Sequence, residues 1–208
     1  MNLINYIITH CKGKTVLIFG EAGTGKTNLV LYILSKLSLT YPRLRYFYIS
    51  TEGSMFKHLI SRYGLDKSRN ILFTEVINNE HLLNVLLNVF MKYGEDIGTI
   101  VIDSINNFYR NEVLYDEKAN VILNTSLSIL AYISSVSNSC VLLTAQVRQR
   151  PNDELDISGA QILMFWADIV IRLSREGKYR VAEVIWPKEL RGLKSLFMIS
   201  YEGVKFVE

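Results

Sequence analysis

One stretch of eight residues constrains the fold of this chain more than any other part of its sequence. Gly20 to Thr27 reads GEAGTGKT and matches the phosphate-binding pattern G-x-x-x-x-G-K-[ST] at every fixed position. The residues before it, Thr15 to Phe19, form a β-branched and aromatic run typical of a strand covered on both faces. The residues after it, Thr27 to Leu37, carry apolar side chains at helical spacing. A glycine-rich turn between a buried strand and a helix predicts an α/β fold with a phosphate site.

The spacing of this motif follows from the chemistry of a nucleoside triphosphate. Glycines let the backbone fold into a nest whose N–H groups point at phosphate oxygens, and the following helix adds its free N-terminal donors. We expect Lys26 to reach the β- and γ-phosphates and the Thr27 hydroxyl to take one Mg²⁺ position. The residues expected to contact the nucleotide are Gly20, Glu21, Ala22, Gly23, Thr24, Gly25, Lys26, Thr27 and Asn28.

Two acidic residues that follow buried strands are candidates for the rest of the site. Asp103 ends the run Ile100 to Ile102, so its carboxylate would lie at the carboxyl edge of the sheet and orient Mg²⁺. An Asp that caps the next helix gives the same pattern and is compatible with that role. Glu52 follows the strand pattern Tyr46 to Ile49 and could polarise the water that attacks the γ-phosphate. Its alternative is a surface acid that begins a helix.

The rest of the chain alternates between strand and helix patterns and then becomes rich in strands. Helix patterns cover Leu3 to Ile8, Met55 to Tyr63, His81 to Tyr93 and Asn120 to Val136. Strand patterns cover Ile71 to Phe73, Thr99 to Ile102, Cys140 to Thr144, Ile169 to Leu173, Tyr179 to Trp186, Ser195 to Ser200 and Val204 to Val207. This order predicts one α/β domain over residues 1–208, with a mixed, mainly parallel central sheet flanked by helices and antiparallel strands at its C-terminal end.

Composition and charge exclude several other classes of protein. Hydrophobic residues make up 49% and charged residues 21%, which excludes a disordered or fibrous chain. No apolar run reaches the roughly 18 to 20 residues of a membrane span. The N-terminal residues do not resemble a secretion signal, and two cysteines give no disulfide framework, so we expect a cytoplasmic protein. The formal net charge of +3 is too small to indicate nucleic acid, so any DNA site must be a local patch.

With these residues in hand, the chain resembles the RecA-type ATPases, in particular archaeal RadA paralogues and single KaiC-like domains. The resemblance covers nearly the whole chain, and its specific parts are GEAGTGKT, ISTEG from Ile49 to Gly53, IVIDS from Ile100 to Ser104, and TAQV from Thr144 to Val147. It implies a RecA-like core that binds ATP and Mg²⁺, with Glu52 as the catalytic base. It also implies that Gln146 senses the γ-phosphate and relays its state to a DNA-contacting loop.

The same resemblance points to a loop that binds single-stranded DNA. The segment Val147 to Glu154 has no apolar periodicity, so we expect a loop, and it coincides with the second DNA-binding loop of RecA-type proteins. Its Arg148 and Arg150 would contact phosphates or stack on bases. The alternative is a plain solvated loop, because nearby acids leave the segment close to neutral.

Two further basic segments are candidates for contacts with DNA or with a neighbouring subunit. The other family DNA loop would lie around Tyr109 to Lys118, where Arg110 and Tyr115 offer a basic and aromatic mixture, although the aromatic residues there could equally cover core. In oligomeric relatives, basic residues near the corresponding position reach across a subunit interface to the neighbour's γ-phosphate. In this chain the resemblance makes Lys188 and Arg191 the candidates for that contact. Such a trans finger would stabilise charge in the transition state, and its alternative is a charged hairpin turn.

Departures from the family pattern favour an accessory paralogue. Recombinases of this family usually show Thr-Asn-Gln before the DNA loop, and Ala145 replaces that Asn. We also expect the residues before the first strand pattern to be too few for the N-terminal helical domain and linker of the main recombinases. These features predict a protein that assists homologous recombination or DNA repair beside a main recombinase or other repair proteins.

Two other functions remain open at this point. A KaiC-like ATPase would act as a nucleotide-controlled regulator of protein partners and would not bind DNA. A small-molecule P-loop kinase would carry an arginine-rich lid, and we find none between Asp103 and Gln146.

Overall fold

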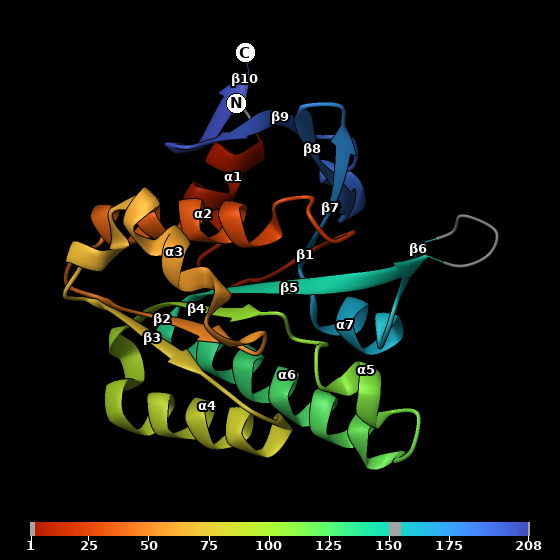
Figure 1. Cartoon of the computed structure of the whole chain (residues 1–208). Helices are drawn as coiled ribbons and strands as arrows, with labels where there is room; N and C mark the ends of the chain where they lie inside the picture. The colour runs from red at the N-terminus through yellow and green to blue at the C-terminus, as the bar shows by residue number, and fades with distance from the viewer. Residues whose placement is uncertain (1–2, 150–154, 208) are drawn as a thin grey trace.

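The strand that leads into the phosphate loop lies inside a central sheet. The strands are β1 (Thr15–Gly20), β2 (Arg45–Ser50), β3 (Ile71–Glu75), β4 (Ile97–Asp103), β5 (Cys140–Gln149), β6 (Leu155–Ile157), β7 (Ile169–Glu176), β8 (Tyr179–Trp186), β9 (Lys194–Ser200) and β10 (Gly203–Val207). In this computed structural model, which describes residues 3–149 and 155–207, they form a ten-stranded sheet in the order β10-β9-β8-β7-β1-β5-β4-β2-β3, with β6 paired to β5 (Figure 1).

Parallel and antiparallel pairings divide this sheet into two parts. Strand β1 pairs in parallel with β5 and β7, and β2 pairs in parallel with β3 and β4. Strands β8, β9 and β10 extend the sheet beyond β7 in antiparallel pairs. The mixed, mainly parallel sheet with antiparallel strands near the C-terminus is therefore confirmed. Because β1, β2, β4 and β5 run in the same direction, their carboxyl ends meet at one edge.

Helices cover both faces of the sheet (Figure 1). On one face lie α1 (Leu3–His10), α2 (Lys26–Thr40) and α3 (Lys57–Ile60), and on the other α4 (Asn79–Tyr93), α5 (Tyr109–Glu112), α6 (Lys118–Ser137) and α7 (Ala160–Trp166). Short 3-10 turns are η1 (Gly53–Phe56), η2 (Ser61–Tyr63), η3 (Leu65–Lys67), η4 (Gly94–Asp96) and η5 (Lys188–Leu190). Successive side chains of β1 enter opposite cores: Val16 and Ile18 pack under α2, whereas Leu17 and Phe19 pack on the other side.

Helix α6 is long and apolar enough to cross a membrane by length and composition, and it is the one such helix among the residues described. Its residues Leu123, Leu127, Leu130 and Ile133 are buried in the core on the second face of the sheet. The face of α6 turned toward the sheet therefore owes its apolar character to packing in the core.

Two expectations about local structure were wrong in part. The predicted helix from Met55 to Tyr63 follows a helical path, but only Lys57–Ile60 is α-helical, between the 3-10 turns η1 and η2. The predicted loop from Val147 to Glu154 begins as a strand, because β5 continues to Gln149 and pairs antiparallel with β6. Pairing with a later segment supplies the backbone hydrogen bonds that no local pattern indicated.

Candidate active site

The phosphate loop leaves β1 through glycines that have no room for a side chain. A Cβ at Gly20 would lie 2.4 Å from the backbone oxygen of Leu173 in β7. Gly25, the N-cap of α2, has a φ of 94°, and a Cβ there would lie 2.5 Å from Cδ1 of Ile199 in β9. Glycine at these positions thus permits both the loop conformation and the close packing of the loop on β7 and β9.

The side chain of Lys26 folds back onto this loop. Its Nζ donates hydrogen bonds to the backbone oxygens of Gly20 at 2.8 Å and Glu21 at 3.0 Å. Burial lowers the pKa of Lys26, the carboxylates of Glu52 and Asp103 act in the opposite direction, and the Arg110 guanidinium adds to the lowering. A phosphate group would offer this ammonium an anionic partner in place of neutral carbonyl oxygens.

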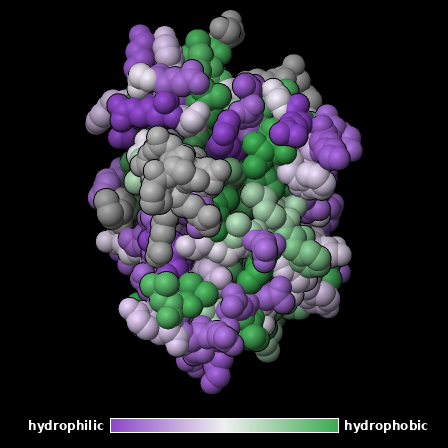
Figure 2. Space-filling model, turned by 90° about the vertical axis from the view of Figure 1, so that its right-hand side faces the viewer, coloured by the Kyte–Doolittle hydropathy of each residue, from purple (hydrophilic) through white to green (hydrophobic). Residues whose placement is uncertain are grey.

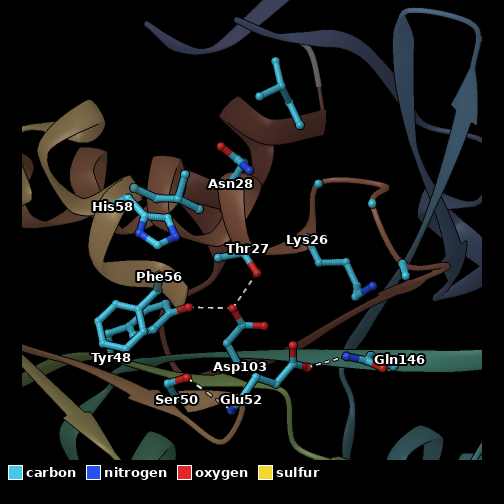
Figure 3. A pocket seen from close by; sticks show the side chains of 15 residues that line it. Lys26, Thr27, Asn28, Tyr48, Ser50, Glu52, Phe56, His58, Asp103 and Gln146 are labelled. Carbon is cyan, nitrogen blue, oxygen red and sulfur yellow. Dashed lines mark hydrogen bonds between the residues drawn. The ribbon is translucent and has the colours of Figure 1, made fainter. Parts of the chain in front are cut away.

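Three hydroxyl groups hold the carboxylate of Asp103 at the end of β4. Its Oδ2 accepts from Thr27 Oγ1 at 2.7 Å and from the Tyr48 hydroxyl at 2.5 Å (Figure 3). Its Oδ1 accepts from Thr144 Oγ1. Burial first, and then the charge of Asp103, raises the pKa of Tyr48 well above its usual range, so this hydroxyl keeps its proton. From the sequence, Tyr48 reads only as part of a buried strand and Thr144 only as the start of the TAQV segment, so neither contact with Asp103 was predicted.

The donor atoms beside the phosphate loop fit Mg²⁺. Thr27 and Asp103 supply a hydroxyl and a carboxylate, which are hard oxygen ligands, and they lie in direct contact. Within residues 3–149 and 155–207 no group of three or more His, Cys, Asp or Glu side chains could hold a metal ion. A cation here would therefore depend on phosphate oxygens and water, which is how Mg²⁺ is usually bound beside nucleotides.

Glu52 and Gln146, predicted from separate strands, contact each other directly. Glu52 Oε1 accepts a hydrogen bond from Gln146 Nε2 at 2.6 Å and another from Ser104 Oγ at 2.6 Å. Glu52 follows β2 and Gln146 lies in β5, so the shared carboxyl edge of the sheet brings them together (Figure 3). Both line, with Lys26, Thr27 and Asp103, a cavity of about 350 Å³.

The far side of this cavity is lined by residues that the sequence analysis missed. Phe56, His58 and Leu59 come from the short helical turns after β2, and Ile199 comes from β9. Asn28, which was predicted to contact the nucleotide, also lines the cavity, and its Oδ1 accepts a hydrogen bond from the Tyr63 hydroxyl at 2.8 Å. The cavity thus continues from the phosphate loop toward a partly apolar end.

The predicted DNA contacts between Tyr109 and Lys118 lie in three different environments. Tyr109 is buried, and its hydroxyl donates to Asn120 Oδ1 at 2.9 Å, whereas Tyr115 is 90% exposed. Arg110 Nη1 donates to Gln146 Oε1 at 2.7 Å. Of the two aromatic residues, Tyr109 therefore covers core, and Arg110 reaches the candidate site itself.

The remaining basic candidates lie at β5, in the segment after it and at η5. Arg148 stands opposite Asp156 in the pairing of β5 with β6, and Arg150 lies outside the described residues. Figure 2 shows the side of the molecule from which β5 and β6 project, where hydrophobic residues form a band beside hydrophilic ones. Lys188 and Arg191 are exposed at η5 and do not line the described cavity.

Comparisons with known proteins agree with this arrangement. The Rad51 family model matches residues 9–206 of the chain. The DNA repair and recombination protein RadB of Methanobrevibacter smithii is 25% identical over 208 residues, which cover 93% of this chain and 88% of the relative. The protein of the same name from Methanococcoides burtonii is 26% identical over 203 residues, which cover 93% and 89%. The match therefore includes the phosphate loop and the strand ends that form the cavity.

Proposed function

The chain belongs to the Rad51 family within the RecA superfamily, and we propose that it is an accessory recombinase paralogue. In this proposal it binds and hydrolyses ATP with Mg²⁺, binds single-stranded DNA and assists homologous recombination and DNA repair. The observation that carries the proposal is the contact between Glu52 and Gln146 on a cavity that the phosphate loop closes. The two relatives named as DNA repair and recombination proteins support the assignment to repair.

The residues of the cavity have complementary roles in hydrolysis. The N–H groups of the loop and the Lys26 ammonium hold the phosphates. Glu52 accepts a proton from water as the water oxygen bonds to the γ-phosphorus and the bond to the leaving oxygen of ADP breaks. Thr27 and Asp103 would hold Mg²⁺, which supplies neutralisation of charge on the phosphate oxygens.

Gln146 connects this chemistry to the proposed DNA site. Its amide contacts Glu52, and the same strand continues through Arg148 to Gln149. An incoming γ-phosphate would compete with Glu52 for the amide protons, because both are anionic acceptors. A change in the hydrogen bonds of Gln146 would therefore be transmitted to Arg148 along the same continuous strand. We place the DNA contact at Arg148 and Arg150.

We also propose where the protein acts and which partners it acts with. We assign it as a single ATPase domain of the cytoplasm that acts with repair proteins such as the main recombinase. Lys188 and Arg191, exposed at η5, are the candidates for a finger that reaches the nucleotide of a second copy.

Replacing Glu52 by Gln tests the ATPase assignment. The amide oxygen of Gln can still accept the hydrogen bonds from Ser104 and Gln146, but it cannot take a proton from water. We expect Glu52→Gln to bind ATP and to hydrolyse it about 10²- to 10⁴-fold more slowly than the wild type. Glu176→Gln, which makes the same chemical change at an exposed position at the end of β7 outside the residues that line the cavity, is the matched control. Equal turnover in wild type and Glu52→Gln would contradict the assigned base.

Single-stranded DNA tests the second half of the proposal. We expect ATP turnover to rise when single-stranded DNA is added, and DNA affinity to differ between the ATP and ADP states. Hydrolysis that continues without any DNA binding would instead favour a nucleotide-controlled regulator of protein partners.

A further inference from the structure

Three side chains from separate elements form a continuous hydrogen-bonded series beside the cavity. Arg110 of α5 donates from Nη1 to Gln146 Oε1 at 2.7 Å, and Gln146 donates from Nε2 to Glu52 Oε1 at 2.6 Å. Arg110 is not among the residues that line the cavity, whereas Gln146 and Glu52 are. The hydrogen-bonded path from the guanidinium to the cavity thus runs through the amide of Gln146.

The chemistry of the three groups permits one orientation of that amide. A guanidinium only donates hydrogen bonds, and a carboxylate only accepts them. The amide of Gln146 has one oxygen, which must face Arg110, and one NH₂ group, which must face Glu52. A flipped amide would set N–H groups against the guanidinium and an oxygen against the carboxylate, and both contacts would be repulsive.

One buried residue, Asn106, holds the backbone of both Arg110 and Gln146. Asn106 Nδ2 donates to the backbone oxygen of Gln146 at 2.9 Å, and the backbone N–H of Gln146 donates to Asn106 Oδ1 at 3.1 Å. The backbone N–H of Arg110 donates to the backbone oxygen of Asn106 at 3.1 Å. Arg110 and Gln146 are therefore anchored to the same residue, which leaves the side-chain amide as the part whose orientation remains to be set.

We propose that Arg110 is a positioning residue that fixes the Gln146 amide with its NH₂ group facing Glu52 and the nucleotide cavity. This role rests on the proposed ATPase function. With the amide in this orientation, Gln146 offers donors both to Glu52 and to an anionic γ-phosphate. Without Arg110 the amide can turn its oxygen toward these anions, and hydrolysis slows although nucleotide binding is retained.

The orientation of the amide can be observed without any activity. In wild type we expect the two side-chain N–H protons of Gln146 to give distinct NMR signals that are slow to exchange with solvent. Gln146→Glu identifies these signals by their loss. In Arg110→Met, which keeps the aliphatic stem and removes the donors, the signals should move toward those of a free glutamine amide. Unchanged signals in Arg110→Met would overturn the proposal.

Kinetics test whether the orientation matters for hydrolysis. In the absence of DNA, Arg110→Met should lower kcat by roughly 10- to 100-fold, because small errors in positioning cost rates of this order, while KM for ATP changes little. Arg110→Lys keeps the charge and an N–H donor group and should restore part of the loss. In a Gln146→Ala background, Arg110→Met should have no further effect. Additive losses would overturn the proposal, since they would mean that Arg110 acts independently of Gln146.

Arg172 provides the control variant, and the competing role for Arg110 is a contact with DNA. Arg172→Met removes an exposed arginine of β7 that pairs with Glu183, and it should leave both the amide signals and kcat unchanged. If Arg110 is instead a DNA contact, Arg110→Met will weaken single-stranded DNA binding and leave turnover without DNA at the wild-type value, which overturns the proposal. If the wild type hydrolyses no ATP, the proposed function fails, and the NMR result still decides whether Arg110 orients Gln146.

Discussion

The hydroxyl of Tyr48 offers a direct test of how the candidate Mg²⁺ site is supported. It donates to Asp103 Oδ2 at 2.5 Å, and its side chain is fully buried. Tyr48→Phe removes one of the donors that fix this carboxylate, while the ring keeps its contacts. Hydrogen bonds to charged groups contribute roughly 1.5–3 kcal/mol, so the melting temperature should fall by about 3–12 °C.

The effect of Tyr48→Phe on Mg²⁺ binding should exceed what the loss of stability alone would cause. Loss of a group that orients a metal ligand typically lowers metal affinity or activity by about 10- to 100-fold. We therefore expect the Mg²⁺ concentration that half-saturates binding of fluorescent ADP to rise by about that factor. The measurement does not depend on hydrolysis, so it reports on the metal site alone.

Tyr46→Phe is the matched control because it alters the same strand at a distance from the site. The Tyr46 side chain is 1% exposed, and its hydroxyl donates to the backbone oxygens of Leu37 and Tyr41. Losing this neutral hydrogen bond should cost about 1 kcal/mol and leave the Mg²⁺ dependence unchanged. The reasoning is refuted if Tyr48→Phe shows the wild-type Mg²⁺ dependence, or if Tyr46→Phe shifts it equally.

Three further predictions follow from contacts of the loop and of β5. Lys26→Met should abolish ATP binding, measured by calorimetry. Because burial lowers the pKa of Lys26, the unfolded chain holds more protons at this side chain just below the ordinary pKa of lysine, so the stability of the wild type relative to the variant should rise with pH there, as the difference between their denaturant midpoints will show. Gly20→Ala should cost about 3 kcal/mol or more, because its Cβ would meet the Leu173 oxygen. Gly23→Ala has no atom within 4 Å of its Cβ and should lose only the roughly 1–2 kcal/mol of its positive φ in thermal melts. Replacing Arg148 and Arg150 by Ala should lower the slope of log affinity against log salt for single-stranded DNA by roughly 1.4; an unchanged slope would place the DNA site elsewhere.

The sheet and its main helices could be predicted because their signals are local. Buried parallel strands read as apolar runs, and the phosphate loop has a fixed pattern between a strand and a helix. Tyr179–Trp186 is a strand with the predicted bounds, and the helix predicted from His81 to Tyr93 begins two residues earlier, at Asn79. Its N-cap, Asn78, accepts from the backbone N–H of His81, and that signal was present in the sequence.

What could not be predicted depends on partners that are distant in the chain. Gln149 belongs to a strand because β6 pairs with it, and no periodicity in residues 147–149 reports that partner. Tyr48 looked like an ordinary strand residue, although a buried tyrosine hydroxyl needs a partner, and β4 beside β2 offers Asp103. The contact of Arg110 with Gln146 joins residues 36 positions apart, so only the fold brings them together.

The position of β1 within the sheet also determines when the nucleotide site can form during synthesis. Both neighbours of β1 come from much later in the chain, since Gly20 pairs with Gln146 and with Leu173. At a translation rate of about 5–20 residues per second, the roughly 125 residues between Gly20 and Gln146 take on the order of 6–25 s to be made. During that interval the phosphate loop has no sheet to support it. In the proposed function, ATP therefore cannot assist the folding of the first half of the nascent chain, and an almost complete sheet must form before the nucleotide can stabilise the protein.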